Sequence, residues 1–357
     1  MEVEVYCRLA ERLDAIPNGF LKTASGVELR LLAKIFTPEE AALGAVMRLH
    51  REPASEIAAR AGAEPHRAYK VLKDMARKGL VRIKKGKGEL GFGLMPFVVG
   101  FYEEQLPRLD EELAQLVEEY LVETKVGTAA QAPSVHRVVP VAEAVPYKLE
   151  VYAYEQASAL LEGAKSWAVR DCICRVQQEL IGKGCNHLRE ACLTFAPVEN
   201  AFDHDPVGRP LTKVEAYEIL RQAEADGLVH TTGNYRDGHF YICNCCPCCC
   251  GVLRGLTEFE IPNAVASSGF YTQVDSELCS GCGDCLERCH FGALSMPDFT
   301  CEVVVPHCVG CGLCVMYCST GALHLERREA YTPPPADLKE WMLQRASARG
   351  ISASDIL

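Results

Sequence analysis

Long apolar runs are absent from this 357-residue sequence. No stretch approaches the roughly 18 consecutive apolar residues that a membrane-spanning helix needs. The first residues, MEVEVYCRLAERLD, are acidic and amphipathic, and they lack the basic start and apolar segment of a secretory leader. We therefore expect a cytoplasmic protein with no membrane span.

The sequence contains 20 cysteines, but its length argues against a disulfide-stapled scaffold as the reason for them. Such scaffolds are small secreted domains that cannot build a sufficient core. This chain is 48% apolar and is long enough for two or three domains with cores of their own. Because cytoplasmic thiols are kept reduced, clustered cysteines here indicate metal ligands.

Charge is distributed unevenly along the chain. Residues 1–100 carry 17 Lys and Arg against 12 Asp and Glu, a net charge of +5, whereas residues 101–357 carry 20 against 36, a net charge of −16. A basic N-terminal part followed by an acidic remainder indicates two kinds of partner, one anionic and one cationic.

The first predicted domain, residues 1–100, contains a helix-turn-helix pattern followed by a hairpin. Residues 54–61 read as a short helix, and Pro65 opens a second helix whose apolar residues recur at helical spacing. Two short strands, LVRI and LGFGL, then flank the basic tip KKGKGE. This order resembles a winged helix-turn-helix.

Basic residues dominate the second helix and the tip of this pattern. From His66 to Gly88 there are nine Lys or Arg and one acid, which is typical of a surface that contacts phosphate. The candidate DNA contacts are His66, Arg67, Lys70 and Lys73 on the helix and Lys84, Lys85 and Lys87 at the tip. The alternative is a protein-docking module whose lysines are only a solvated face, because a fold does not determine a function.

The next segment, residues 101–146, is predicted to be an amphipathic helix and a linker. In LPRLDEELAQLVEEYLVE (106–123), apolar residues recur at helical spacing with acids on the opposite face. The helix can pack on its own chain or on a second copy, so a homodimer stays open.

A helix-to-hairpin pattern occurs twice in the chain. RAYKVLKDMARKGLVR (67–82) and EAYEILRQAEADGLVH (215–230) share the same apolar and glycine positions. The second copy is acidic where the first is basic or neutral, so it is not expected to bind DNA. Its hairpin, from LVHTT to HFYIC, leads instead into a cysteine cluster.

A strong metal motif lies in the segment 263–330. CSGCGDCLERCHFGAL and CVGCGLCVMYCSTGAL are both C-x2-C-x2-C-x3-C followed by Gly-Ala-Leu, a repeat with a period of 29 residues. In such runs three thiolates bind one 4Fe–4S cluster and the fourth binds the cluster of the other run. The two predicted ligand sets are Cys279, Cys282, Cys285 and Cys318, and Cys308, Cys311, Cys314 and Cys289.

Zinc is the alternative metal for closely spaced cysteines, but zinc motifs bring two pairs of ligands separated by a longer insert. Cys301 lies outside both runs and is expected to be a buried structural thiol.

The segment resembles bacterial two-cluster ferredoxins, in which proline usually follows the fourth cysteine; here His290 and Ser319 take that place. Residues 331–357 are predicted to be a Pro-rich linker and a C-terminal helix.

Ten further cysteines lie in the predicted Cys-rich domain, residues 147–262. They form two groups: Cys172, Cys174, Cys185 and Cys192, and then Cys243, Cys245, Cys246, Cys248, Cys249 and Cys250. Because adjacent residues of an extended chain point to opposite sides, the second group cannot all bind one cluster. A 4Fe–4S cluster takes four thiolates, so ten satisfy two clusters with two left over, or one cluster with a reactive dithiol.

Cations near these cysteines favour ionised thiols. The cationic residues close in sequence are Arg170, Arg175, Lys183, His187, Arg189 and Arg254. Zinc or copper storage is an alternative, since thiolates also suit those metals, and a bundle of inert buried thiols is another. We expect a hairpin that ends at Ile242, with Cys172 and Cys174 sharing one iron–sulfur centre with Cys246 and Cys249.

The order of these segments resembles a family of 4Fe–4S dicluster proteins from anaerobic bacteria and archaea, described as ferredoxin-like. The segments that carry the resemblance are the N-terminal winged helix, AVRDCICR, ICNCCPCCCG and the two-cluster motif. The CCG of residues 249–251 also resembles the cysteine-rich domain of heterodisulfide reductase subunits, which carry noncubane clusters. The resemblance implies an iron–sulfur protein with no settled reaction.

We therefore predict an α+β multidomain iron–sulfur protein that transfers electrons to or from a redox partner protein. It would carry two ferredoxin-type 4Fe–4S clusters and one or two additional iron–sulfur clusters in the central domain. Two other functions stay open: a redox-sensing winged-helix transcription regulator, and a thiol or disulfide reductase with a substrate at the central site. The sequence names no catalytic residue, substrate or partner.

Overall fold

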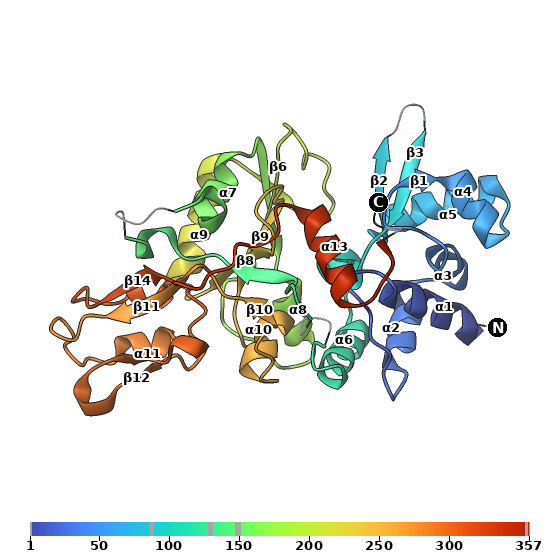
Figure 1. The fold of residues 1–357 in the computed structure, drawn as a ribbon. Coiled ribbons are helices and arrows are strands. Elements are labelled where there is room, and N and C mark those ends of the chain that lie inside the picture. The colour runs from blue at the N-terminus through green and yellow to red at the C-terminus, as the bar shows by residue number, and fades with distance from the viewer. Residues whose placement is uncertain (1, 86–88, 128–130, 147–150, 354–355, 357) are drawn as a thin grey trace. The chain divides into compact units, whose positions relative to one another are not determined.

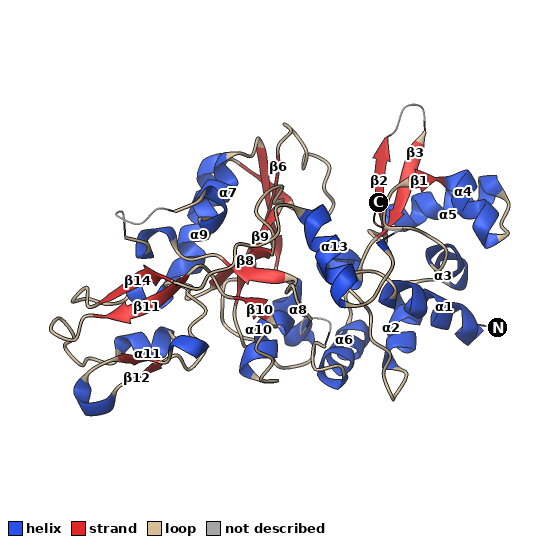
Figure 2. Cartoon of the chain, viewed as in Figure 1, coloured by secondary structure: helices blue, strands red, loops and turns tan. Residues whose placement is uncertain are grey.

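A computed structural model describes residues 2–85, 89–127, 131–146, 151–353 and 356. Helices and small sheets are mixed along the chain, which confirms the expected α+β class (Figures 1 and 2). The chain divides into two compact units. The first comprises Met1–Ala132, Gln177–Gly182 and Met342–Leu357, and the second comprises Pro133–Val176 and Lys183–Trp341.

The first unit contains six helices among its described N-terminal residues, and a three-stranded sheet in the order β1-β3-β2. The helices are α1 (Glu2–Asp14), α2 (Val27–Ile35), α3 (Pro38–Gly44), α4 (Ala54–Ala61), α5 (Pro65–Arg77) and α6 (Glu111–Glu123). The strands are β1 (Glu52–Pro53), β2 (Val81–Lys85) and β3 (Leu90–Leu94). The helix, turn, helix and hairpin expected between residues 54 and 94 are therefore present in that order.

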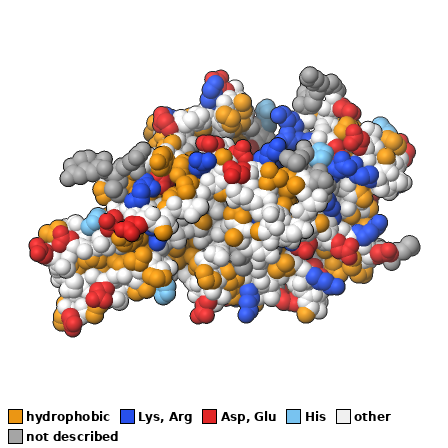
Figure 3. Space-filling view, in the orientation of Figure 1, with side chains coloured by type: hydrophobic (Ala, Val, Ile, Leu, Met, Phe, Trp, Pro, Cys, Tyr) orange, Lys and Arg blue, Asp and Glu red, His pale blue; other side chains and the backbone are white. Residues whose placement is uncertain are grey.

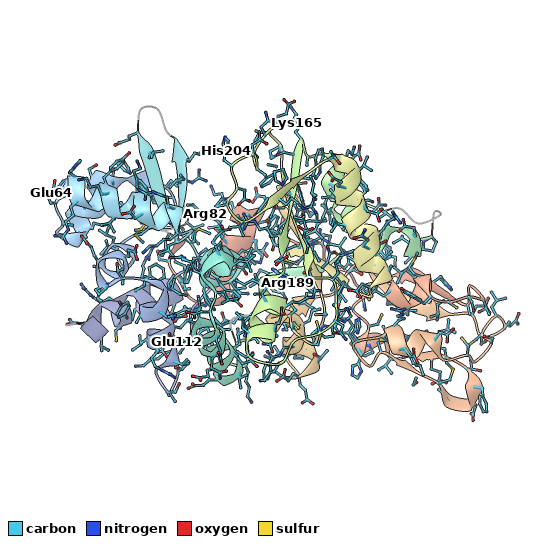
Figure 4. All side chains as sticks on the ribbon, turned by 180° about the vertical axis from the view of Figure 1, so that it is seen from behind. Glu64, Arg82, Glu112, Lys165, Arg189 and His204 are labelled. Atoms are coloured by element: carbon cyan, nitrogen blue, oxygen red, sulfur yellow. The ribbon has the colours of Figure 1, made fainter. Side chains whose placement is uncertain are left out.

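Helix α5 shows why this pattern could be recognised from sequence. Pro65 occupies its first turn, where a missing N–H costs nothing, and the Glu64 carboxylate accepts hydrogen bonds from the backbone of His66 and Arg67 (Figure 4). Ala68, Leu72 and Met75 are buried. Gly79 follows the helix with φ at +69°, a conformation that favours glycine.

We expected the amphipathic segment 106–123 to be one helix, but it is not. Residues Glu103–Arg108 form a separate 3₁₀ turn, and α6 begins only at Glu111 because the Asp110 side chain caps it by accepting a hydrogen bond from the Leu113 N–H. The apolar face of α6 packs within its own unit, where Tyr120 stacks on Phe20 with ring centroids 4.8 Å apart. The helix therefore buries its apolar face without a second copy of the chain.

The second unit is built around a seven-stranded sheet in the order β10-β4-β8-β9-β6-β5-β7, and two further two-stranded sheets pair β11 with β14 and β12 with β13. The strands of the seven-stranded sheet are β4 (His136–Val138), β5 (Ser166–Asp171), β6 (Glu190–Ala196), β7 (Arg209–Leu211), β8 (Val229–Gly233), β9 (Tyr241–Cys245) and β10 (Val265–Ala266). The smaller sheets use β11 (Phe270–Val274), β12 (Leu294–Ser295), β13 (Glu302–Val303) and β14 (Leu323–Arg327).

Seven helices accompany these strands in the described part of the chain. They are α7 (Ala157–Glu162), α8 (Ile173–Leu180), α9 (Lys213–Ala225), α10 (Gly251–Thr257), α11 (Asp284–Arg288), α12 (Leu313–Met316) and α13 (Leu338–Ala348). The last residues of α8 and α13 belong to the first unit. Among the described residues, no helix is both long enough and apolar enough to cross a membrane.

Helix α9 and strand β8 repeat the local structure of α5 and β2. Thr212 and Glu215 form a capping box at the start of α9, and Gly227 follows the helix with φ at +75°. The chain then enters the antiparallel hairpin β8–β9, in which Val229 pairs with Cys245. Strand β9 thus extends three residues beyond the expected end of the hairpin at Ile242, and carries regular structure into the cysteine cluster.

Candidate metal centres

The four cysteines of the first predicted ferredoxin set line one cavity. Cys279, Cys282 and Cys285 come from the loop before α11 and its first turn, whereas Cys318 follows α12 in the other repeat. Met296, Leu323 and Tyr317 are among the side chains that complete the lining.

The four cysteines of the second predicted set line a separate cavity. Here Cys308, Cys311 and Cys314 lie near the start of α12, and Cys289 comes from the end of α11. Each cavity is therefore lined by three cysteines from one run and by the fourth cysteine of the other run.

Backbone and hydroxyl groups surround the sulfurs of these cavities. The backbone N–H of Thr272 lies 3.4 Å from the Cys308 sulfur, and that of Ala293 lies 3.3 Å from the Cys289 sulfur. At Gly310, with φ at +70°, an added Cβ would lie 2.1 Å from the carbonyl oxygen of Phe270. Donors aimed at sulfur and a backbone too close for side chains fit a bound iron–sulfur cluster.

Cys301 borders the first cavity without belonging to the predicted ligand set. Its sulfur lies 3.7 Å from that of Cys285, and its backbone N–H lies 3.4 Å from the sulfur of Cys279. Only 3% of its surface is exposed, and burial raises the pKa of its thiol to about 12. These features agree with a neutral packing thiol.

The ten central cysteines separate into two sets, each drawn from both groups of the sequence. The compact set is Cys185, Cys246, Cys248 and Cys249, whose sulfurs all lie within 4.8 Å of one another. The other set is Cys172, Cys174, Cys192, Cys243, Cys245 and Cys250, which are connected by hydrogen bonds between successive thiols.

We expected Cys172 and Cys174 to share one centre with Cys246 and Cys249. Cys174 does pack against the cluster of Cys246 and Cys249, but the thiols of Cys172 and Cys174 bond within the other set. The reason is the extension of β9, because side chains alternate across a strand. Cys243 and Cys245 therefore share one face, and Cys246 is the first cysteine available to the other side of the chain.

The compact set joins two loops. Cys185 lies between α8 and β6, and the other three residues lie in the turn between β9 and α10. The sulfur of Cys185 is 3.9 Å from that of Cys246 and 3.4 Å from that of Cys249. Cys246 and Cys249 are buried, whereas Cys248 is exposed.

Ion pairs and hydrogen bonds hold the loop that carries Cys185. The Leu188 backbone donates to the Asp226 carboxylate over 2.7 Å, and His187 lies 3.2 Å from the same carboxylate. Arg189, labelled in Figure 4, pairs with Asp171 over 2.8 Å at the start of β6. The loop is therefore fixed at both α9 and β5.

The six-thiol set surrounds the start of α10. The sulfur of Cys250 accepts hydrogen bonds from Cys174 and from Cys245, and these bonds lower its pKa well below the usual range. His136 lies near Cys250, and burial lowers the pKa of its imidazole. Neither ring nitrogen of His136 has a hydrogen-bond partner among the described residues.

Arg175 lies between the two central sets and is 3% exposed. Burial opposes its charge, but the neighbouring sulfurs of Cys172, Cys246 and Cys245 raise the pKa of its guanidinium. Its Nη2 atom donates to the carbonyl of Asn244 over 2.7 Å. A buried, charged guanidinium beside these thiols fits thiolates bound to a metal.

His136 was not identified from the sequence, since a single histidine in an apolar strand carries no local pattern. Arg175 was noted only for its closeness in sequence to cysteines. Its position between both sets depends on the fold.

The candidate nucleic-acid contacts occupy one exposed face of α5 and the edge of β2. His66, Arg67, Lys70, Lys73 and Lys84 are exposed. Arg67 forms an ion pair with Glu39, and the Lys73 ammonium lies 5.8 Å from the centre of the Tyr69 ring. Lys87 and the Lys85 side chain lie outside the described residues.

Comparisons with known proteins add no identification: no family model, no curated protein and no solved structure matches this chain. The compact cysteine set shows that the chain has a group of side chains able to hold a metal ion. Which metal it holds, and what the other sets bind, are matters of proposal.

Proposed function

We propose that the chain is an iron–sulfur electron-transfer protein with two 4Fe–4S clusters in residues 263–330 and a further iron–sulfur group at the six central thiols. The observation that carries this proposal is the exchange of the fourth cysteine between the two cavities. Such clusters supply one-electron chemistry when they are bound. A single zinc ion needs only four nearby ligands, so zinc binding does not require the two runs to exchange their fourth cysteines.

The packing of the second unit favours electron transfer between the second cavity and the central thiols. A single hydrophobic core contains Cys245 and Cys250 as well as Val309 and Leu313, and Cys311 packs against it. The backbone N–H of Val141 also donates to the carbonyl of Cys311 over 2.9 Å. Packed apolar side chains therefore lie between the second cavity and the central thiols.

The surface near the first cavity suits a redox partner protein. Cys282 is exposed, and several large apolar side chains are exposed in the same segment (Figure 3). They are Leu278, Phe299, Val304, Val305 and Met316. Exposed apolar residues near a redox centre are typical of transient partner surfaces.

The test is anaerobic purification followed by iron, sulfide and zinc analysis and low-temperature electron paramagnetic resonance. Two ferredoxin clusters account for about eight irons, and a further cluster raises this number. Replacing Cys282 with serine should alter one ferredoxin signal, and replacing Cys174 should alter only the central signal. Protein with eight irons or fewer would contradict the central iron–sulfur group, and protein without sulfide would contradict the whole proposal.

A second candidate function, DNA binding by the first unit, is favoured by the exposed basic face of α5. If this face contacts phosphates, the double variant K70A/K73A should bind duplex DNA more weakly and with a smaller salt dependence. The matched control is K213A, which removes a lysine from the first turn of the acidic helix α9. Equal affinity of all three proteins, or no salt-sensitive binding by the unaltered chain, would indicate a docking role.

A further inference from the structure

The spacing of the sulfurs distinguishes the compact set from the ferredoxin sets. Cys185, Cys246, Cys248 and Cys249 bring four sulfurs within 4.8 Å of one another, and two of the distances are 3.9 and 3.4 Å. Among the described residues, no three of the predicted ferredoxin thiols come this close to one another. The predicted ferredoxin sulfurs are therefore spread around their cavities, whereas the sulfurs of the compact set are gathered together.

These short distances between sulfurs match those expected when four thiolates bind a single metal ion. A tetrahedron of thiolates at about 2.3 Å from a zinc ion has its sulfurs about 3.8 Å apart. A 4Fe–4S cluster binds each thiolate to a different iron, so its four sulfurs cannot come into mutual contact. The observed contacts leave no space for inorganic sulfide between the side chains.

We infer that Cys185, Cys246, Cys248 and Cys249 form a closed tetrathiolate site for one divalent metal ion of the zinc or ferrous type. All four positions of the tetrahedron are filled by protein, as in structural rather than catalytic zinc sites. This inference concerns residues other than the iron–sulfur ligands of the proposed function and does not rest on it.

The surroundings compensate the charge of such a site. Four thiolates and one divalent ion carry a net charge of −2, and the Arg175 guanidinium lies beside the Cys246 sulfur, which raises the pKa of the guanidinium. Cys246 and Cys249 pack in an apolar cluster with Ala223 and Leu228. A partly compensated charge with apolar walls suits a site that holds its ion permanently.

The ion would have a structural role in positioning the neighbouring thiols. It ties the loop after α8 to the turn between β9 and α10. Cys245 directly precedes that turn, and Cys250 ends it as the N-cap of α10. The single ion therefore holds the two segments that deliver Cys245 and Cys250 to the six-thiol set.

The experiment compares metal content in the anaerobically purified full chain and in the variants C185S and C248S, with C7S as the control. Cys7 is a free thiol in α1, outside all four cysteine sets. We expect C185S and C248S each to lose about one zinc per chain, while sulfide stays at the level of the unaltered protein and C7S loses nothing. Loss of one iron without sulfide would support the same site with iron as its ion.

Loss of several irons together with sulfide in C185S or C248S, with the zinc content unchanged, would overturn the inference, because the set would then hold a cluster. X-ray absorption at the zinc edge of the unaltered chain gives an answer that does not depend on the variants folding. We expect four sulfur neighbours at about 2.3 Å and no second metal shell. Absence of ferredoxin iron in the same samples would contradict the proposed function but leave the zinc result standing.

Discussion

The Nε2 atom of His290 lies 2.7 Å from the carbonyl oxygen of Gly227. Because a carbonyl can only accept, the imidazole donates this hydrogen bond. His290 directly follows the fourth cysteine of the first run, and Gly227 ends the helix that precedes the β8–β9 hairpin. In the other repeat, the Tyr317 hydroxyl donates to the carbonyl of Ala225 over 2.6 Å. Both repeats are thus attached to the end of α9.

Replacing His290 with alanine should loosen this attachment without removing a cluster ligand. We expect the unfolding free energy to fall by about 1 kcal/mol, the usual net value of such a hydrogen bond. Amide hydrogen exchange around Gly227 should accelerate. The variant Y317F removes the equivalent bond of the other repeat and should behave alike. Iron content should be unchanged in both, so a loss of about four irons would mean that His290 acts on the cluster itself.

Replacing Arg175 with methionine should lower the reduction potential of the central site. A buried cation favours the reduced, more negative state, and its removal disfavours that state. We expect a shift on the order of 60 mV, which is a tenfold change for one electron, measured by a redox titration followed by paramagnetic resonance. The variant R175K keeps the charge and should shift less. Unchanged central potentials in R175M would contradict the position assigned to this guanidinium.

Replacing Cys301 with alanine should leave all iron in place. The side chain is buried against Cys285, so its truncation should cost about 1 kcal/mol of unfolding free energy through lost packing. The matched variant C285A should lose about four irons, since it removes a predicted ligand of the first cavity. Iron analysis of both variants decides the matter. If C301A lost as much iron as C285A, Cys301 would be a ligand.

Stability should depend on pH through His239. Burial, together with the nearby Arg137, lowers the pKa of its imidazole to about 4. The ring stacks on Tyr235 and bonds to the Thr232 hydroxyl. Between pH 6.5 and about 4 the unfolded chain therefore binds a proton that the folded chain does not, and stability falls as the pH falls, by up to about 3 kcal/mol.

Acid also releases bound metal, but it does so from H239Q and from the unaltered chain alike. Comparing the two proteins therefore isolates the effect of His239. The difference in unfolding free energy between H239Q and the unaltered chain should be constant above pH 7 and should shift in favour of H239Q as the pH is lowered to 5. Chemical denaturation at several pH values measures it. A difference that does not change with pH would show that His239 titrates normally.

Local patterns predicted the local structures of this protein well. The helix, glycine and strand of residues 67–82 and their second copy at 215–230 adopt the same conformation, because Gly79 and Gly227 both take positive φ angles at the helix ends. The prediction for residues 106–123 was wrong at its start, since the Asp110 side chain competes for the backbone and begins the helix later. The residue at which such a helix begins depends on a single capping side chain, and it is easily missed when only the spacing of apolar residues is considered.

The sequence by itself determined which cysteines line each of the two cavities in residues 263–330, because the spacing within a run and the repetition of that run are properties of neighbouring residues. Only the tertiary structure decided how the ten central cysteines divide. Cys185 and Cys246 are separated by 61 residues, and their contact depends on the return of the chain through β6, α9 and β8. The division also depends on the length of β9, since one residue more or less in a strand moves each later side chain to the opposite face.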